Sequence, residues 1–260
     1  MATVEKTISS RRIKSVASDA AEKMAEDLLQ PRYQSRLKDK AYLASLRKEL
    51  DSVGFVCLEG FLQKDALTRL QREVSELEGQ AQANHSGKNQ KYSVKGAMLN
   101  GTVVDELAKS KPILDLINGI LQDGSDGRRP IIEDSIVGTE VVPGLNIMRG
   151  PGDVTTLHFD GTFMNILVPV FIPKIEGPNR GQLTIYPNVR SFRRNFYDRI
   201  VVPILCRAKL ARFLFRPAEI DYEPGNIYIF YGYRSFHGVL SPSAPGLRCT
   251  TNMTVGARRF

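Results

Sequence analysis

The chain has 260 residues and 42% of them are hydrophobic, so it can bury a core and is not a disordered polypeptide. Its formal net charge is +8, but the lysines and arginines are scattered. This distribution favours a basic surface that attracts small anions over a nucleic-acid interface.

The cysteines, Cys57, Cys206 and Cys249, form no CxxC pair, which argues against a disulfide scaffold and for a reducing compartment. The first residues lack the apolar segment of a secretory signal, and no apolar run reaches the ~18 residues of a membrane span. We therefore expect a soluble, cytoplasmic protein with no membrane partner. The sequence does not indicate its oligomeric state.

Helices are predicted in the first half of the chain. Residues 1–16 are polar and basic and are expected to form a flexible N-terminus. Apolar residues recur at three- and four-residue spacing within 16–50, 62–77 and 103–122, a pattern typical of amphipathic helices. Between the first two of these segments, residues 54–59 predict one short buried strand.

Residues 79–102 are polar, rich in Gly, Asn and Ser, and show no clear period. A loop of this length is usually functional in a compact domain, which makes the segment a candidate lid over a binding site. Its lysines, Lys88, Lys91 and Lys95, are candidate partners for a substrate carboxylate, with a role as plain surface charges as the alternative. His85, in the same loop, is not expected to be a metal ligand.

Short strands dominate after residue 130, punctuated by Gly, Pro and Asn. The predicted strand segments are 131–138, 139–150, 155–161, 163–173, 181–188, 225–232 and 248–256. One helix is expected at about 196–214. The predicted fold is mainly β with helices (α+β): a double-stranded β-helix, or jelly roll, with a helical layer on one sheet. We expect one domain over 17–260, with helical support at 17–125 and the jelly-roll core at 130–260.

A metal site is predicted from two of the three histidines. His158 and Asp160 form an HxD motif, and in a strand residues i and i+2 point to the same face. His237 follows an aromatic strand and precedes a Pro/Ser/Gly turn. Two histidines and one carboxylate on one side of a metal leave adjacent positions open, the arrangement of non-heme Fe(II) oxygenases. The alternatives are an HxD that caps a turn and a His237 that only packs in the core.

Arg248 is the candidate anchor for a dicarboxylate. A strand, a turn and a return strand would bring its planar guanidinium near His237. Alternation predicts a polar face towards the lumen (Arg248, Thr250, Asn252, Thr254) and a mostly apolar face towards the core (Leu247, Cys249, Thr251, Met253, Val255). This pattern argues against the alternative of a surface arginine on an edge strand. Arg149 is a second candidate for an anionic co-substrate, although a surface role is the better interpretation.

The ordered set of motifs resembles the Fe(II)/2-oxoglutarate-dependent dioxygenase superfamily. It comprises the HxD, the stretch NRGQLTIYPN at 179–188, Pro-Gly-Asn at 224–226, then His237 and Arg248. The resemblance covers 130–260 and extends to about residue 50. It implies Fe(II) held by His158, Asp160 and His237, 2-oxoglutarate held by Arg248, and O2 as second co-substrate.

Within that superfamily, the stretch that begins at Tyr186 resembles small oxygenases acting on free amino acids, some of them hydroxylases and some halogenases. This likeness implies that Glu140, Asn252 and Thr254 contact the substrate. The absence of Trp is a departure from that group. A phytanoyl-CoA-hydroxylase-like enzyme, acting on a natural product or an acyl substrate, is the sibling interpretation.

Asp160 bears on the type of reaction, because the related halogenases carry a small residue in place of this carboxylate. Hydroxylation of an unactivated C–H bond, or another oxidation such as desaturation or ring closure, is therefore favoured over halogenation. The expected substrate is a small polar molecule, a free amino acid or a derivative of one. Alternatives of other classes are a cupin-like metal-binding module without turnover and a basic nucleic-acid-binding protein.

Overall fold

The computed structural model describes residues 27–84, 91–122, 136–177, 179–191 and 215–258, together with positions 200, 202 and 204. Residues 1–16, His85, Lys88 and nearly all of the helix expected at 196–214 lie outside this part of the chain. In the part described, no helix combines the length and the apolar character that crossing a membrane requires.

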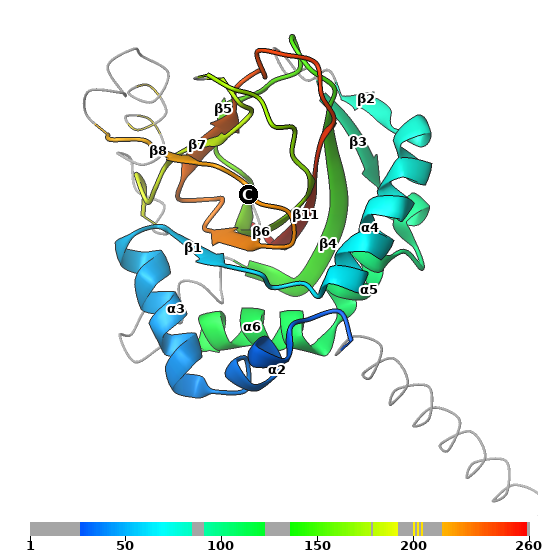
Figure 1. Ribbon diagram of the computed structural model, residues 1–260. Coiled ribbons are helices and arrows are strands. Elements are labelled where there is room, and N and C mark those ends of the chain that lie inside the picture. The colour runs from blue at the N-terminus through cyan, green and yellow to red at the C-terminus, as the bar shows by residue number, and fades with distance from the viewer. Residues whose placement is uncertain are drawn as a thin grey trace, which may run out of the picture.

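The described strands form two antiparallel sheets that face each other (Figure 1). The larger sheet has the order β1-β9-β6-β11-β4-β3-β2, and the smaller sheet has the order β5-β10-β7-β8. The larger sheet comprises β1 (Phe55–Leu58), β2 (Gln82–Asn84), β3 (Lys91–Lys95), β4 (Ile136–Met148), β6 (Thr162–Phe171), β9 (Ile227–Phe230) and β11 (Arg248–Arg258). The smaller sheet comprises β5 (Thr155–His158), β7 (Leu183–Tyr186), β8 (Ala218–Ile220) and β10 (Phe236–Val239). This is the predicted jelly roll.

Helices cover the outer face of the larger sheet (Figure 1). They are α2 (Pro31–Arg36), α3 (Lys40–Ser52), α4 (Lys64–Leu77), α5 (Val103–Lys109) and α6 (Lys111–Gln122), with short 3-10 turns at Glu78–Gln80 and Gly96–Leu99. Their buried leucines, isoleucines and valines share one core with Cys249, Met253 and Val255 of β11. The core-facing half of the predicted alternation along β11 is therefore confirmed, as is the helical layer on one sheet.

The predicted helix at 103–122 is two helices that meet at Ser110. Ser110 has an extended backbone with ψ of 139°, and its side chain accepts a hydrogen bond from the Ile113 amide at 3.4 Å. Pro112 explains the break. A proline inside a continuous helix would lack the N–H that bonds the carbonyl four residues earlier, whereas it fits the first turn of a new helix.

The prediction of a structureless loop at 79–102 is wrong for much of its length. Gln82–Asn84 and Lys91–Lys95 are β2 and β3, and β3 pairs with β4, Tyr92 opposite Ile147 and Lys95 opposite Gly144. The segment is too short and too polar to show an alternation of its own, and the edge of the larger sheet gives it its strand conformation. A movable lid therefore does not include β3, because Ser93 and Val94 are buried.

Candidate active site

A pocket of about 260 Å³ lies between the two sheets. Its walls come from β3, β4, β6, β9 and β11 of the larger sheet and from β5, β7 and β10 of the smaller one. Every charged or metal-ligating residue predicted from the jelly-roll half and described with its side chain faces this pocket, except Arg149. Those lining residues include His158, Asp160, His237, Arg248, Thr250, Asn252 and Thr254.

His158, Asp160 and His237 converge at one end of the pocket. The Nε2 atom of His158 lies 3.1 Å from Oδ1 of Asp160, and the Nε2 atom of His237 lies 3.1 Å from Oδ2 of the same carboxylate. One ligand atom from each residue lies within 4.8 Å of the other two. Asp160 stands just beyond the end of β5, where its amide donates to the Gly232 carbonyl at 3.1 Å. The HxD spacing thus delivers both of its side chains to the same point.

The two imidazoles are oriented by hydrogen bonds to backbone carbonyls. Nδ1 of His158 lies 2.8 Å from the Thr156 carbonyl oxygen, and Nδ1 of His237 lies 2.9 Å from that of Ser235. A carbonyl can only accept, so each Nδ1 carries a proton. Each Nε2 faces Asp160 and is the atom that would bind a metal in place of the proton that it donates to the carboxylate.

Asp160 is held ionised. Burial by itself would raise the pKa of this carboxyl, but the charge of His237 and the hydrogen bonds from both histidines outweigh burial and hold it well below its usual range. The Asn165 side-chain amide also donates to Oδ2 of Asp160. Burial would lower the pKa of His158, but the hydrogen bond and charge of Asp160 raise it. The result is an ionised carboxylate between two imidazoles, an arrangement that favours the binding of a cation.

Arg248 is 2% exposed and lines the pocket towards its other end: it begins β11, whereas Thr254, six residues further on, pairs with Asn165 beside Asp160. Its Nε donates to the Gly181 carbonyl at 2.7 Å, and its guanidinium stacks 5.1 Å from the centre of the Tyr222 ring. Its Nη2 is buried with no hydrogen-bond partner among the described residues, as is the Tyr222 hydroxyl. A buried, unpaired donor of this kind is costly unless an anion occupies the pocket beside it. These donors fit a carboxylate.

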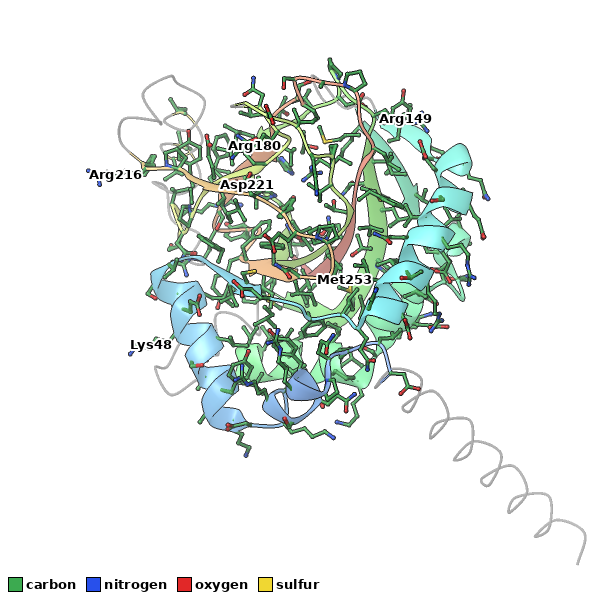
Figure 2. All side chains as sticks on the ribbon, viewed as in Figure 1. Lys48, Arg149, Arg180, Arg216, Asp221 and Met253 are labelled. Atoms are coloured by element: carbon green, nitrogen blue, oxygen red, sulfur yellow. The ribbon has the colours of Figure 1, made fainter. Side chains whose placement is uncertain are left out.

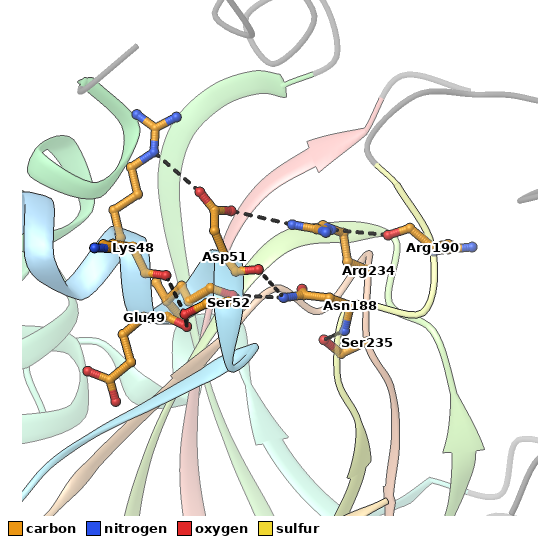
Figure 3. A network of polar contacts seen from close by, with 10 residues as sticks. Lys48, Glu49, Asp51, Ser52, Asn188, Arg190, Arg234 and Ser235 are labelled. Atoms are coloured by element: carbon orange, nitrogen blue, oxygen red, sulfur yellow. Dashed lines mark hydrogen bonds and ion pairs between the residues drawn. The ribbon is translucent and has the colours of Figure 1, made fainter. Parts of the chain in front are cut away.

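A network of polar contacts ties the loop that precedes His237 to the end of α3 (Figure 3). The Asn188 side chain donates to the Leu50 and Asp51 carbonyls at 2.8 and 3.2 Å, and its amide donates to the Ser235 hydroxyl at 3.3 Å. The Asp51 carboxylate pairs with Arg234 at 3.4 Å. Ser235 supplies the carbonyl that orients His237, so this network supports the metal end of the pocket from behind.

The other predicted residues divide into those that face the pocket and those that do not. Asn252 and Thr254 line it, as do Lys91 and Lys95 of β3. Glu140 lies on β4, but its side chain is outside the described part of the chain. Arg149 points away from the site (Figure 2): it pairs with Glu78 at 3.2 Å and stacks on Tyr92, which confirms the surface role.

Sequence reasoning missed Asn165, Tyr222 and Gly232. Asn165 shares the concave face of its strand with the residue opposite it, Thr254, which a known register would have revealed. A β-carbon on Gly232 would stand 2.7 Å from Oδ2 of Asp160, so the absence of a side chain there makes room for the carboxylate. None of the three residues belongs to a sequence motif. His237 follows the aromatic strand β9, as predicted, and lies within β10, a strand that the sequence did not predict.

Comparison with known proteins gives a likeness in structure but not in sequence. No protein-family model matches the chain, and no curated protein matches it. Solved structures do match. The non-heme alpha-ketoglutarate-dependent epimerase SnoN from nogalamycin biosynthesis superposes with a TM-score of 0.59 at 16% identity, over 84% of each chain.

Two prolyl hydroxylases are also similar. The prolyl-4-hydroxylase of Pseudomonas putida matches with a TM-score of 0.57 at 13% identity, over 84% of this chain and all of that one. The prolyl hydroxylase of Trichoplax adhaerens matches at 0.58 and 13% identity, over 89% and 96%. This chain has the fold of the Fe(II)/2-oxoglutarate oxygenases. The resemblance predicted from the motifs is thereby confirmed at the level of the fold.

Proposed function

We propose that the protein is an Fe(II)- and 2-oxoglutarate-dependent oxygenase. The observation that carries the proposal is one pocket with a His-Asp-His cluster at one end and the buried, unpaired Nη2 of Arg248 at the other. When bound, Fe(II) with 2-oxoglutarate and O2 would supply the oxidation of an unactivated C–H bond, with succinate and CO2 as co-products.

The roles of the chain's own residues follow from their contacts. His158, Asp160 and His237 would hold the metal through two Nε2 atoms and an ionised carboxylate, all from one side. Arg248 would pair through its planar fork with the distal carboxylate of 2-oxoglutarate, which needs a partner at that depth. The packed walls, with Leu167, Leu183 and Phe230 among them, would exclude water from the reacting groups.

We propose hydroxylation, or another oxidation such as desaturation or ring closure, in preference to halogenation. Asp160 supports this, because its carboxylate would fill the coordination position that a halide needs.

The proposed substrate is a small polar molecule, a free amino acid or a derivative of one. A pocket of about 260 Å³ that also admits 2-oxoglutarate leaves little room for an acyl chain, and most ligand pockets are roughly 300–1,000 Å³. Asn252 and Thr254 would contact the substrate, and Glu140 of β4 remains a proposed contact.

A metal-binding module without turnover is the alternative from another class. It accounts for the His-Asp-His cluster but gives no reason for the buried Arg248, whose Nη2 has no hydrogen-bond partner among the described residues, in the same pocket.

 The oxygenase proposal accounts for both ends of the pocket, because a dicarboxylate that chelates the metal must have its far end neutralised.

The test is a turnover assay with purified, metal-free protein. Added Fe(II) should enable conversion of 2-oxoglutarate to succinate under air, slowly without substrate and faster with members of a panel of amino acids and other small metabolites. The variant Asp160→Ala should lose this conversion, whereas Asp221→Ala, which removes an exposed carboxylate, should keep it (Figure 2). A wild-type protein that binds Fe(II) but neither binds nor consumes 2-oxoglutarate would refute the proposal in favour of the metal-binding module.

A further inference from the structure

The larger sheet brings two lysines into the pocket. Lys91 and Lys95 both line it, and they point to the same face of β3 because they lie four residues apart in a strand. Lys91 is partly buried, and Lys95 is exposed towards solvent. Among the described residues, no carboxylate forms an ion pair with either ammonium. Both ammonium groups therefore line the pocket without a paired carboxylate among the described residues.

The charges around the proposed metal explain why these lysines call for a further ligand. With the metal and co-substrate bound, Asp160 and the two carboxylates of 2-oxoglutarate balance the charges of Fe(II) and Arg248. Asp160 is the only carboxylate among the described lining residues. Nothing in the described walls is then left to balance Lys91 and Lys95. Burial, with Lys95 and Arg248 nearby, lowers the pKa of Lys91 although Asp160 opposes the shift, which is the response of an ammonium without a close anion.

A glycine lies between Lys95 and a polar side chain on β11. Lys95 is paired with Gly144 of β4, and Gly144 with Asn252 of β11, so the three residues form one row across the sheet. Gly144 has no side chain, and a β-carbon there would lie 3.8 Å from Cγ of Lys95. The stem of Lys95 therefore runs over Gly144. Oδ1 of Asn252 is buried and has no hydrogen-bond partner among the described residues.

We infer that Lys91 and Lys95 form a substrate subsite that binds a carboxylate of the molecule to be oxidised, while Oδ1 of Asn252 accepts a hydrogen bond from a donor on the same molecule. This inference rests on the proposed function and narrows its substrate to an anionic one. An α-amino acid carries a carboxylate and an ammonium donor on one carbon, which matches a cationic and an accepting group brought together by the row over Gly144. The lysines are specificity-determining residues and take no part in holding the metal.

The experiment compares matched ligands that differ in one charge. Protein loaded with Zn(II) and 2-oxoglutarate, which occupies the site without turnover, is titrated calorimetrically with L-amino acids and with their primary amides. At least one amino acid should bind, and its amide should bind on the order of tenfold more weakly or worse, as expected for the loss of a charge-assisted contact. Lys91→Met should weaken the amino acid by a similar factor, and Lys95→Met by less, because Lys95 is more exposed. Lys48→Met is the control, since it removes the same charge from the outer surface of α3 (Figure 2).

The loading step keeps two failures apart. If the protein does not take up Zn(II) and 2-oxoglutarate, the proposed function fails. If loading is normal but no amino acid binds, if amides bind equally well, or if both lysine variants behave like Lys48→Met, the subsite is refuted alone. Titration of 2-oxoglutarate is the second readout: its affinity should stay within about twofold in Lys91→Met. A loss as large as that in Arg248→Met would assign Lys91 to the co-substrate and overturn the inference.

Discussion

His158 and His237 are cross-strand partners: they lie directly opposite each other in the β5–β10 pair, with ring centroids 4.7 Å apart. Each Nδ1 faces the carbonyl two residues earlier in its own chain segment, that of Thr156 or that of Ser235. The two rings therefore reach Asp160 through equivalent atoms, one on each carboxylate oxygen. A single strand pairing thus sets the geometry of the whole cluster.

Removal of either histidine should destroy metal binding. In His158→Ala or His237→Ala, the remaining imidazole and Asp160 can offer only two side-chain ligands, and we expect the affinity for Co(II) or Fe(II) to fall by more than about a hundredfold. Isothermal titration of the metal-free protein measures this loss, and circular dichroism checks the fold. Asp221→Ala is the control, because that carboxylate is exposed and its ion pair, within the described part of the chain, is with Arg180. Near-normal metal affinity in both histidine variants would show that the metal site lies elsewhere.

Arg248→Leu should raise the concentration of 2-oxoglutarate needed for turnover while leaving metal affinity nearly unchanged. Truncating one partner of a buried charge pair weakens binding on the order of a hundredfold or more. The protein should remain folded, because a leucine buried against Tyr222 and Met148 avoids the cost of a desolvated charge. Arg248→Lys keeps the charge but loses the planar fork, so its requirement for 2-oxoglutarate should lie between those of the wild type and Arg248→Leu.

Steady-state kinetics at varied 2-oxoglutarate, combined with direct titration, tests this expectation. Arg180→Leu is the matched control, since its guanidinium is on the surface and is bound to Asp221 (Figure 2). An unchanged affinity in Arg248→Leu would remove this residue from the co-substrate site.

The sequence predicted the chemical groups of the site better than their surroundings. The HxD spacing and the alternation along 248–255 depend only on the two-residue period of a strand, so both could be read before the fold was known. The juxtaposition of His237 with His158 depends on strand pairing between distant segments, so the sequence could suggest it only from the residue types and the family resemblance, not from a spacing rule. β3 was missed because its conformation comes from the edge of β4 rather than from its own residues. Asn165, Gly144 and Gly232 gain their roles from register and close packing, which leave no signal in one sequence.

Asp160 should prevent halogenation. We expect wild-type protein to form no chlorinated product even in high chloride, because the carboxylate occupies the position that a halide would need on the metal. Asp160→Gly removes the carboxylate and also frees Asn165, which donates to it. In this variant, halide should bind to the metal-loaded protein, detectable by the change in the Co(II) absorption spectrum. A chlorinated product from the wild type, detected by mass spectrometry, would contradict this use of Asp160.

Asn188→Ala should destabilise the protein and loosen the metal end of the pocket. Asn188 has a φ of 51°, and its side chain supplies two hydrogen bonds to carbonyls at the end of α3 (Figure 3). An alanine loses these bonds and retains the cost of a β-carbon in the left-handed region, so we expect a loss of about 2–4 kcal/mol in the free energy of unfolding.

Asn188→Gly separates the two causes. Glycine adopts a positive φ freely, so this variant loses the hydrogen bonds without the strain and should be the less damaged of the two. Urea denaturation measures both variants, and metal titration should show weaker binding, because Ser235 of the same network orients His237. Equal stability of Asn188→Ala and the wild type would mean that the network does not support the fold.

Gly232→Ala should impair the metal site through a single methyl group. A β-carbon at this position would stand 2.7 Å from Oδ2 of Asp160 and 2.9 Å from Nδ2 of Asn165, closer than real contacts allow. Gly232 does not have a positive φ, so the substitution adds no backbone strain of its own. The methyl group must therefore displace the carboxylate or its amide partner. Asp160 is the predicted metal ligand that contacts both histidines. We therefore expect metal affinity to fall by roughly tenfold or more, as when a supporting group of a metal ligand is lost.

Gly79→Ala is the control, because a β-carbon there meets nothing within 4 Å, and it should bind metal like the wild type. Titration of both variants with Co(II), alongside their thermal unfolding, distinguishes displacement of Asp160 from general destabilisation: unaltered affinity in Gly232→Ala would show that the carboxylate has room to move and that its position is not fixed by this close packing.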